Sequence, residues 1–331
     1  MSESFAGQRV LVTGATGFIG GHLSRRLVAE NAKVRALARD PARAGALSQS
    51  GVEVVRGDLR DPASLAAAVQ GCPWVFHFAG IVDDFAPDAD YRAVNVEGTR
   101  ALVEAALAAG VQRFVHASTI AVYGLRPAPD TDERAPDVAS DDAYSDTKLE
   151  AEHLVCRFVA ERGLPAVIAQ LGITYGPGDD AWTLAPLKRI RSGGMLLPGG
   201  GAALAQPIYI DDVIEGVLAV ARRGAIGERY ILRGPETVTF KQYFGELARI
   251  AGKQGLPGVP VWAAFAMADI TSALARITGQ TPMATRAQIR WLTASRTFSG
   301  RKAREGLGFE AAIDLKTGMA RLEEWLRRTK T

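Results

Sequence analysis

Cysteine and histidine are scarce in this chain of 331 residues, which has two of the former and four of the latter. Cys72 and Cys156 lie far apart, so they indicate neither a disulfide framework nor a Cys-x-x-Cys metal site, and a reducing compartment fits them best. None of the histidines has the i, i+4 spacing of a helical zinc pair. The four are His22, His77, His116 and His153. The sequence therefore predicts no metal site.

An excess of charge and long apolar runs are also absent. The formal net charge is only +3, with 39 basic and 36 acidic side chains dispersed among one another, which argues against a nucleic-acid partner. No stretch is long and apolar enough for a transmembrane helix, and residues 1–7 lack the basic and apolar segments of a signal peptide. We expect a cytoplasmic protein with no integral membrane segment.

The first half of the chain has the alternation of a parallel sheet covered by helices. Between Gln8 and Gly172, short β-branched runs alternate with longer Ala- and Leu-rich segments. The runs are nearly continuous in apolar character, as expected of strands covered on both faces. The predicted strands are Arg9–Thr13, Lys33–Ala38, Glu53–Arg56, Trp74–Phe78, Arg113–Ala117 and Ala166–Gln170. This pattern predicts an α/β fold of the Rossmann type, with a doubly wound parallel sheet.

Helix boundaries can be placed from capping residues. Asp61 is suited to cap a helix that begins at Pro62, and Gly110 and Gly163 stand where helices should end. Asp211 and Asp212 open a predicted helix over Asp211–Arg223, where we expect them to cap it and face its dipole. A strand is predicted over Arg229–Leu232. Thr239, with Gln242 three residues on, predicts a capping box for the helix that follows.

The change of pattern near residue 175 predicts two domains, since the length allows one large and one smaller domain. Pro- and Gly-rich turns follow Gly172, and the chain is mainly helical from Val259. We expect a dinucleotide-binding domain of residues 1–175 plus 211–234. The smaller, mostly helical substrate-binding domain would comprise residues 176–210 plus 235–331.

A glycine-rich turn links the first predicted strand to the first helix, in the segment from Val10 to Gly20. Gly14, Gly17 and Gly20 permit a tight turn, close approach of the backbone to a pyrophosphate, and close packing of helix on strand. The free N–H groups of the helix N-terminus then face the anion. With strand before and helix after it, this turn predicts a dinucleotide site.

The motif TGxxGxxG over Thr13–Gly20 resembles the fingerprint of the extended short-chain dehydrogenase/reductases. Further segments match that family in its order: Gly57-Asp58-Leu59, Phe76–Gly80, Asn95 in Val94–Thr99, and the strand end that leads into Val122-Tyr123-Gly124. The sequence is most similar to the branch with 3β-hydroxysteroid dehydrogenases, dihydroflavonol reductases and hopanoid-associated epimerases. The resemblance implies cofactor contacts by Gly14, Thr16, Gly17, Phe18, Ile19, Gly20, Arg39, Asp58, Leu59, Ala79, Gly80, Tyr144, Lys148 and Ile173.

Tyr144 and Lys148 are the predicted catalytic pair. Four residues apart on one helix, they share a face. A tyrosine works as a proton donor near neutrality when a nearby ammonium group stabilises its phenolate. By the resemblance, Thr119 is the hydroxyl that binds the substrate oxygen, with Ser118 as the neighbouring alternative, and Asn95 supports the catalytic site.

Cofactor choice depends on the end of the second strand, where Arg39 stands. An acidic residue there would bind the ribose 2′-hydroxyl, whereas a guanidinium pairs with a 2′-phosphate. We therefore predict NADP, with NAD as the open alternative.

Departures from the family pattern bear on the reaction. Ile120 stands where dehydratases carry an acid, and Ala205, followed by Gln206, stands where sugar-nucleotide enzymes carry a diphosphate-binding Arg. Gln170-Leu171 replaces the usual Arg-Pro. We predict an oxidoreductase that acts on a secondary alcohol or ketone. A nucleotide-sugar epimerase is the alternative, and a dinucleotide-binding protein without turnover is a third hypothesis.

The substrate is predicted to be largely apolar and covered by C-terminal helices. The segment Val259–Leu274 has more apolar residues than one buried stripe requires, and Trp262, Phe265 and Met267 cannot share one face. The second apolar surface could instead face a partner or a membrane interface, and burial of this helix between the domains is a further alternative. The loop Met195–Pro198 is expected to add apolar side chains near the cleft. A homodimer is what the family resemblance implies.

Overall fold

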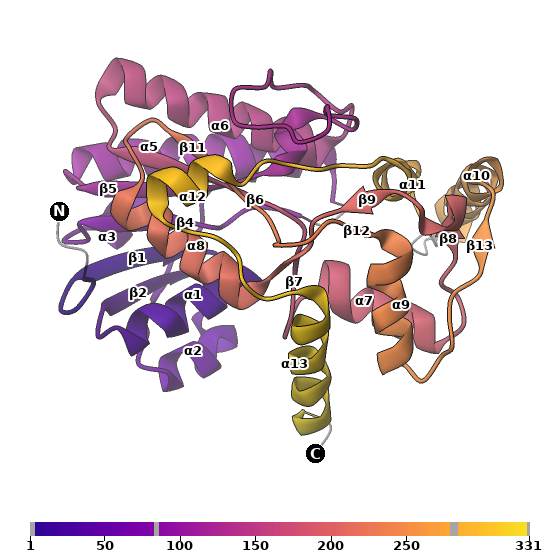
Figure 1. The fold of residues 1–331 in the computed structure, drawn as a ribbon. Coiled ribbons are helices and arrows are strands. Elements are labelled where there is room, and N and C mark those ends of the chain that lie inside the picture. Colours follow the sequence, from indigo (N-terminus) through magenta and orange to yellow (C-terminus); the bar gives the residue numbers. More distant parts are fainter. Residues whose placement is uncertain (1–3, 83–85, 279–283, 330–331) are drawn as a thin grey trace.

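A seven-stranded parallel sheet forms the centre of the protein. The computed structural model describes residues 4–82, 86–278 and 284–329 (Figure 1). The strand order is β11-β6-β5-β4-β1-β2-β3, and every neighbouring pair is parallel. The strands are β1 (Arg9–Thr13), β2 (Lys33–Ala38), β3 (Glu53–Arg56), β4 (Trp74–His77), β5 (Arg113–Thr119), β6 (Ala166–Leu171) and β11 (Arg229–Leu232). The predicted Rossmann-type fold and its strands are confirmed, with ends that differ by one or two residues.

Helices cover both faces of this sheet, because alternate side chains of each strand point to opposite sides. Val10 and Val12 pack into one core with Leu23 and Leu27, whereas Leu11 packs into the other. The first face carries α1 (Phe18–Ala29), α2 (Gly45–Gln49) and α8 (Ile210–Arg223). The second face carries α3 (Pro62–Val69), α5 (Gly98–Ala108) and α6 (Ala143–Arg162). Two apolar cores thus hold one sheet between them.

The predicted helix ends are found where capping chemistry placed them. Asp61 accepts a hydrogen bond from the Ala63 N–H at the start of α3. Gly163 ends α6 in the left-handed region, with φ 68°. Thr239 and Gln242 exchange both bonds of a capping box at the start of α9 (Phe240–Ile250). Local sequence therefore determines these boundaries.

The predicted capping role of Asp211 and Asp212 is wrong. Tyr209 precedes α8 and makes no side-chain cap, and the two aspartates lie inside the first turn, where their charge still faces the helix dipole. Asp212 instead accepts hydrogen bonds from the N–H groups of Ala312 and Ile313, at 3.0 and 2.8 Å. Asp211 pairs with Arg321 of α13 at 2.9 Å. Both carboxylates thus bind the C-terminal segment to α8. These bonds could not be predicted from spacing, because their partners lie about a hundred residues further along the chain.

The remaining strands form three small two-stranded sheets beyond the main one. They pair β7 (Thr174–Tyr175) with β10 (Ile208–Tyr209), β9 (Leu204–Ala205) with β12 (Val238–Thr239), and β8 (Leu197–Pro198) with β13 (Gly258–Val259). The other α-helices are α4 (Asp88–Tyr91), α7 (Ala185–Arg191), α10 (Val261–Thr278), α11 (Arg286–Thr293), α12 (Arg301–Leu307) and α13 (Leu315–Arg328). Short 3₁₀ turns are η1 (Pro41–Ala44), η3 (Ile120–Tyr123) and η5 (Gly199–Gly201), and two π-helical segments are η2 (Arg92–Glu97) and η4 (Asp180–Leu184).

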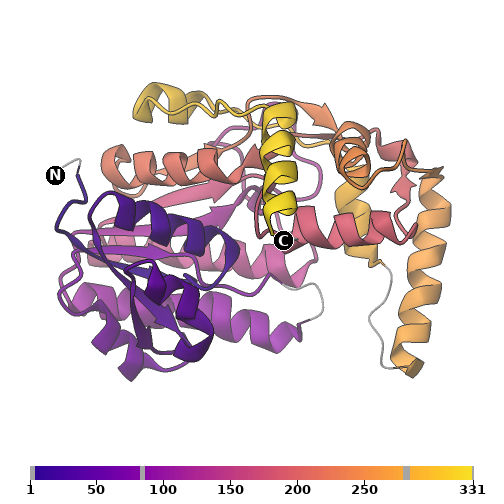
Figure 2. The same ribbon diagram turned by 90° about the horizontal axis from the view of Figure 1, so that it is seen from below.

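Helix α10 extends away from the rest of the molecule (Figure 2). Its buried side includes Ala264 and Ala268, whereas Trp262 and Ile270 are 76% and 60% exposed. The helix is therefore not buried between two domains. In the described part of the chain, no helix combines the length and apolar character needed to cross a membrane.

The side chains of Met195 and Leu197 belong to the main core. β8 pairs with β13, and Leu196, between the two buried residues, is half-buried. The contribution of this loop to a substrate cleft stays a prediction.

Candidate functional site

The glycine-rich turn is shaped by contacts that exclude any side chain. Gly14 has φ 71°, and a Cβ there would lie 2.6 Å from the Ala79 nitrogen. A Cβ on Gly20 would collide with the Gly14 carbonyl, so α1 packs closely on the turn only because Gly20 lacks one. Gly17 precedes α1 without a side-chain cap, which leaves the first N–H groups of the helix directed toward the end of β1. The turn therefore has the free donors that bind a pyrophosphate.

A buried chain of hydrogen bonds supports this turn from below. The Ala79 N–H donates to the Thr13 hydroxyl, which lies 2.8 Å from His77 Nδ1. His77 Nε2 lies 2.9 Å from the Thr99 hydroxyl, which itself donates to the Asn95 carbonyl at 2.6 Å. Since Thr99 donates onward, Nε2 carries the proton and Nδ1 accepts from Thr13. Burial lowers the pKa of His77 to about 3, so the ring is neutral. One tautomer thus connects β1, β4 and α5.

Asn95 connects the loop after β4 to α6. Its Oδ1 accepts from the Ile81 N–H at 2.8 Å, and its Nδ2 donates to the Thr147 hydroxyl at 3.1 Å. Asn95 lies within the π-helical segment η2, a conformation that is rare and frequent at functional sites. The side chain is buried and sits between the cofactor end of β4 and the helix bearing Tyr144 and Lys148.

Tyr144 and Lys148 lie at the start of α6, beside the carboxyl end of β5. Asp142 caps this helix by accepting from the Ser145 N–H at 3.0 Å. Lys148 Nζ donates to the Ala117 carbonyl at 2.5 Å, two residues before Thr119. The structure therefore brings Lys148 next to the predicted catalytic strand end.

Burial lowers the pKa of Lys148 from its ordinary 10.5 to about 8, and the attraction of Glu152 opposes this shift. An ammonium group with a pKa near 8 is mainly charged at neutral pH and can stabilise a phenolate.

Thr119 and Ser118 point to opposite faces of the sheet, as adjacent strand residues must. Thr119 is 9% exposed, and its hydroxyl accepts from the Ala121 N–H at 3.2 Å. Ser118 is buried on the α6 side, beside Glu152. Only one of the two hydroxyls can therefore face a given substrate.

The other predicted cofactor residues follow the carboxyl ends of the strands. Arg39 is exposed directly after β2. Asp58, after β3, binds Arg60 through that residue's guanidinium and backbone N–H, and these bonds lower the pKa of Asp58. Leu59 is buried against Gly98, and Ile173 is buried just beyond β6. Thr16 is exposed, Phe18, Ile19 and Ala79 are half-buried, and Gly80 is exposed. They line the edge of the sheet where doubly wound proteins bind dinucleotides.

A buried polar cluster lies between α6 and the strands β5 and β6, and it was not predicted from the sequence. Gln170 accepts from the Tyr123 hydroxyl at 2.7 Å and donates to both oxygens of Glu152 at 3.0 and 3.2 Å. Glu152 also lies 3.2 Å from Arg229. Burial raises the pKa of Glu152, which the hydrogen bonds and Arg229 counteract. The Gln170 departure from the family pattern was the only sequence signal for this cluster.

No cluster of three or more His, Cys, Asp or Glu side chains suited to a metal is found among the described residues. Cys72 and Cys156 are free thiols.

Taken with the doubly wound sheet, the glycine-rich turn and the Tyr144–Lys148 pair define the class of nicotinamide-dependent short-chain enzymes. The structure provides free N–H donors at the turn after β1, and a phenol and an ammonium group on α6 beside β5.

Comparison with known proteins identifies the family. The family model described as "NAD dependent epimerase/dehydratase family" matches residues 10–232. A ketoreductase of Stigmatella aurantiaca that acts on 4-hydroxy-2-methyl-3-oxo-4-farnesyl-3,4-dihydroquinoline-1-oxide is 31% identical, with 96% of each chain covered. A 3-beta-hydroxysteroid dehydrogenase of Mycolicibacterium neoaurum is 28% identical over 94% of this chain and 89% of its own.

Among solved structures, the dTDP-glucose 4,6-dehydratase DesIV of Streptomyces venezuelae, with NAD bound, is 25% identical. The TM-score is 0.81, with 98% of each chain covered. The chain belongs to the NAD-dependent epimerase/dehydratase family, and the resemblance to extended short-chain dehydrogenase/reductases is confirmed. It is an NAD(P)-dependent enzyme of that type.

Proposed function

We propose that this protein transfers hydride between a nicotinamide cofactor and a secondary alcohol or ketone in a largely apolar substrate. The observation that carries the proposal is the placement of Tyr144 and Lys148 at the carboxyl end of β5, with Lys148 bonded to Ala117. Relatives named for ketone and hydroxysteroid chemistry support the reaction class. Steroid-, flavonol- or polyketide-like compounds are the proposed substrates.

In the proposed mechanism each residue has one task. Tyr144 exchanges a proton with the substrate oxygen, and Thr119 donates a hydrogen bond to that oxygen. Lys148 stabilises the Tyr144 phenolate and holds the nicotinamide ribose. Asn95 positions α6 through Thr147. The nicotinamide, when bound, supplies or accepts the hydride.

The cofactor is proposed to be NADP. Arg39 is exposed immediately after β2, at the strand end where a 2′-phosphate would lie. Its guanidinium can pair with two phosphate oxygens, and it is near enough to Asp58 to contribute to the lowered pKa of that carboxyl.

Replacing Arg39 tests the cofactor proposal. Arg39→Asp should weaken NADP binding by about 1–3 kcal/mol, since it removes charge-assisted hydrogen bonds, and should affect NAD much less. Calorimetric titration with both cofactors measures this. Arg157→Asp, an exposed charge reversal on α6, is the control and should change neither affinity. Equal NADP affinity in wild type and Arg39→Asp would remove Arg39 from the site.

Replacing Tyr144 tests the reaction. Tyr144→Phe should lower turnover by about 10² to 10⁴-fold while cofactor affinity is retained, because only the acid/base group is lost. The control is Tyr230→Phe, which removes a hydroxyl that binds the Ala225 N–H and should leave turnover unchanged. Near-full turnover of Tyr144→Phe on an active ketone would refute the assignment.

A nucleotide-sugar epimerase is the second candidate, because the matching family model is named for epimerases and dehydratases and the solved neighbour DesIV, a dTDP-glucose 4,6-dehydratase, is named for a nucleotide sugar. Ala205, buried on β9, has no charge to offer a diphosphate. A panel of steroids and flavonoids, compared with uridine and thymidine diphosphate sugars in the presence of NADP, separates the two functions. Micromolar binding of a diphosphate sugar with none of an apolar compound would favour the epimerase.

Three further proposals concern the domain division, the oligomeric state and the cellular location. We propose the two-domain division given above, supported by the contribution of α8 and β11 to the main sheet's layers. A homodimer is proposed from the family resemblance. A cytoplasmic location is proposed from the two free cysteines.

A further inference from the structure

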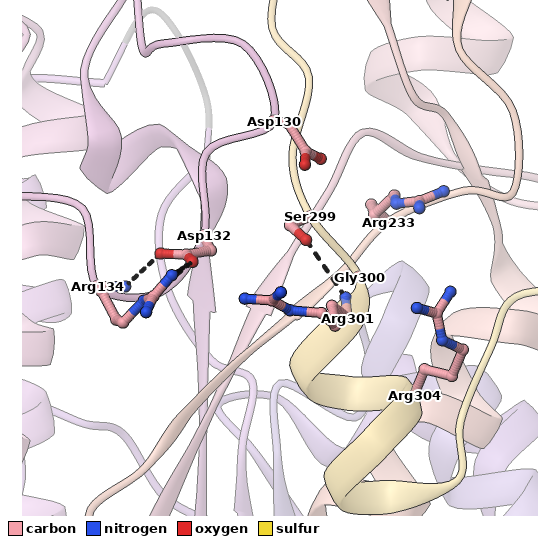
Figure 3. A pocket seen from close by; sticks show the side chains of 8 residues that line it. All are labelled: Asp130, Asp132, Arg134, Arg233, Ser299, Gly300, Arg301 and Arg304. Atoms are coloured by element: carbon pink, nitrogen blue, oxygen red, sulfur yellow. Dashed lines mark hydrogen bonds and ion pairs between the residues drawn. The ribbon is translucent and has the colours of Figure 1, made fainter.

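A polar cavity of about 480 Å³ opens at the outer edge of the main sheet. Its walls come from the loop 130–134, from the residue after β11, and from residues 299–304 (Figure 3). These walls are joined by backbone bonds: Thr131 N–H donates to the Thr297 carbonyl at 3.1 Å, and Ser299 N–H donates to the Thr131 carbonyl at 2.9 Å. Glu133 accepts from the Ile231 N–H at 2.8 Å, which holds the loop on β11. The cavity therefore has fixed walls.

Four arginines and two aspartates carry the charge of this cavity, which we call the arginine pocket. They are Arg134, Arg233, Arg301, Arg304, Asp130 and Asp132. Asp132 pairs with Arg134, whose guanidinium donates to Oδ2 at 2.6 and 3.0 Å and whose backbone N–H donates to Oδ1 at 3.0 Å. That pair is neutral, so three arginines remain against one aspartate.

The three remaining guanidinium groups have few partners of their own. Arg233 donates to the carbonyls of Gly234 and Pro235, and its buried Nε has no hydrogen-bond partner in the described structure. Arg304 faces Glu310 at 3.6 Å, which is too long for a good hydrogen bond. For the Arg301 guanidinium, the described residues provide neither a hydrogen bond nor an ion pair, and its interaction is a longer-range attraction to Asp132, which already pairs with Arg134.

Figure 3 shows how these groups lie around the pocket. Arg301 points toward the Asp132–Arg134 pair, and Arg233 and Arg304 lie on the other side of Gly300. Gly300 lies against Arg233, because a Cβ there would be 3.3 Å from its Nε. The pocket is lined almost entirely by polar atoms, so an apolar substrate does not fit it.

An excess of planar guanidinium donors around a polar cavity is the chemistry that binds phosphate groups. The volume is within the range of small-molecule sites. The pocket lies beside β11, which is the fourth strand from β1 in the sheet. Neighbouring strands are about 4.8 Å apart, so the pocket is about 19 Å from the glycine-rich turn, measured across the sheet. It is therefore separate from the pyrophosphate-binding end of the dinucleotide cleft.

We propose that the arginine pocket is a second anion site, which binds a small molecule bearing a phosphate or diphosphate group. The site uses Arg301 and Arg304 as its accessible donors and Arg233 as its fixed one. It is independent of the glycine-rich turn.

Inorganic pyrophosphate is the probe that tests this site. Calorimetric titration is performed on the full chain saturated with cofactor, so that the glycine-rich turn is already filled. Wild type should bind one equivalent of pyrophosphate, and Arg301→Ala and Arg304→Ala should each weaken binding about tenfold, since each removes a charge-assisted hydrogen bond. Both side chains are exposed, so these changes should leave the fold intact. The control is Arg191→Ala, an exposed arginine of α7 outside the pocket, which should bind as wild type does.

Two results would overturn the proposal. One is the absence of pyrophosphate binding by the cofactor-saturated wild type at low ionic strength. The other is equal affinity in wild type, Arg301→Ala and Arg304→Ala, which would place any bound anion elsewhere. Orthophosphate and citrate are titrated alongside, and tighter binding of citrate than of pyrophosphate would also contradict a phosphate site.

Discussion

Glu152→Gln is the substitution that separates the structural from the electrostatic role of the buried polar cluster. The Glu152 side chain is 0% exposed and contacts Gln170 and Arg229, and it lies one helical turn from Lys148. Glutamine has the same shape and can still accept from Gln170, so the change removes the charge and little else.

The stability loss follows from the pair with Arg229. Breaking a buried ion pair costs about 3–5 kcal/mol. Arg229 is partly exposed and keeps its ion pair with Asp137 at 2.6 Å, so we expect a loss at or just below the lower limit of that range, about 2–3 kcal/mol. Urea denaturation monitored by circular dichroism measures the free energy of unfolding.

The pH dependence follows from Lys148. The attraction of Glu152 raises the pKa of Lys148, which burial lowers to about 8, so the variant should lower this pKa further. The ammonium form is lost as pH rises through the Lys148 pKa, and turnover that needs it falls there. The alkaline limb of the kcat profile should therefore move to lower pH in Glu152→Gln.

Glu150→Gln is the matched control on the same helix. Glu150 forms an exposed pair with Arg92, so its loss should cost less than about 1 kcal/mol and leave the alkaline limb in place. If Glu152→Gln unfolds at the wild-type urea concentration and keeps the wild-type alkaline limb, the assigned role of Glu152 is wrong.

Two other predictions concern the glycine-rich turn and the neutral histidine. Gly14→Ala should destabilise the protein by more than about 1–2 kcal/mol, because φ is 71° and the new Cβ would clash with the Ala79 backbone. The control is Gly110→Ala, at φ 65° in open space, which has the conformational cost alone. Equal losses of unfolding free energy in urea denaturation would contradict this prediction. His77 has a folded pKa of about 3, below its unfolded value of about 6.5, so the stability it contributes is present above pH 6.5 and is lost as pH falls toward 3. Between pH 7 and pH 5 the loss should be about 2 kcal/mol, and urea denaturation of a His77→Gln variant should give a profile that is flatter by that amount. An unchanged profile would contradict the neutral buried ring.

Local chemistry accounts for what the sequence predicts well. The β-branched runs locate the strands, and Asp61, Gly163 and the Thr239–Gln242 box locate helix ends, because each signal acts within a few residues. The glycine-rich turn was predictable for the same reason.

Long-range pairing accounts for what the sequence does not predict. Asp212 binds Ala312 and Ile313, and Gln170 binds Glu152 and Tyr123, so neither partner set is visible from spacing. The arginine pocket likewise combines residues near 130 with residues near 300. Such contacts are decided by tertiary packing rather than by local propensity.

The strand order also bears on how the chain emerges from the ribosome. β1 forms first and lies inside the sheet, and strands β2 to β6 each add beside a strand that already exists. β11 is different, because residues 172–228 must be made before it can pair with β6. Until then β6 is an open edge of unpaired N–H and C=O groups, a template for pairing with other chains. A nascent or truncated chain that ends before residue 229 should therefore depend on chaperones and aggregate in their absence.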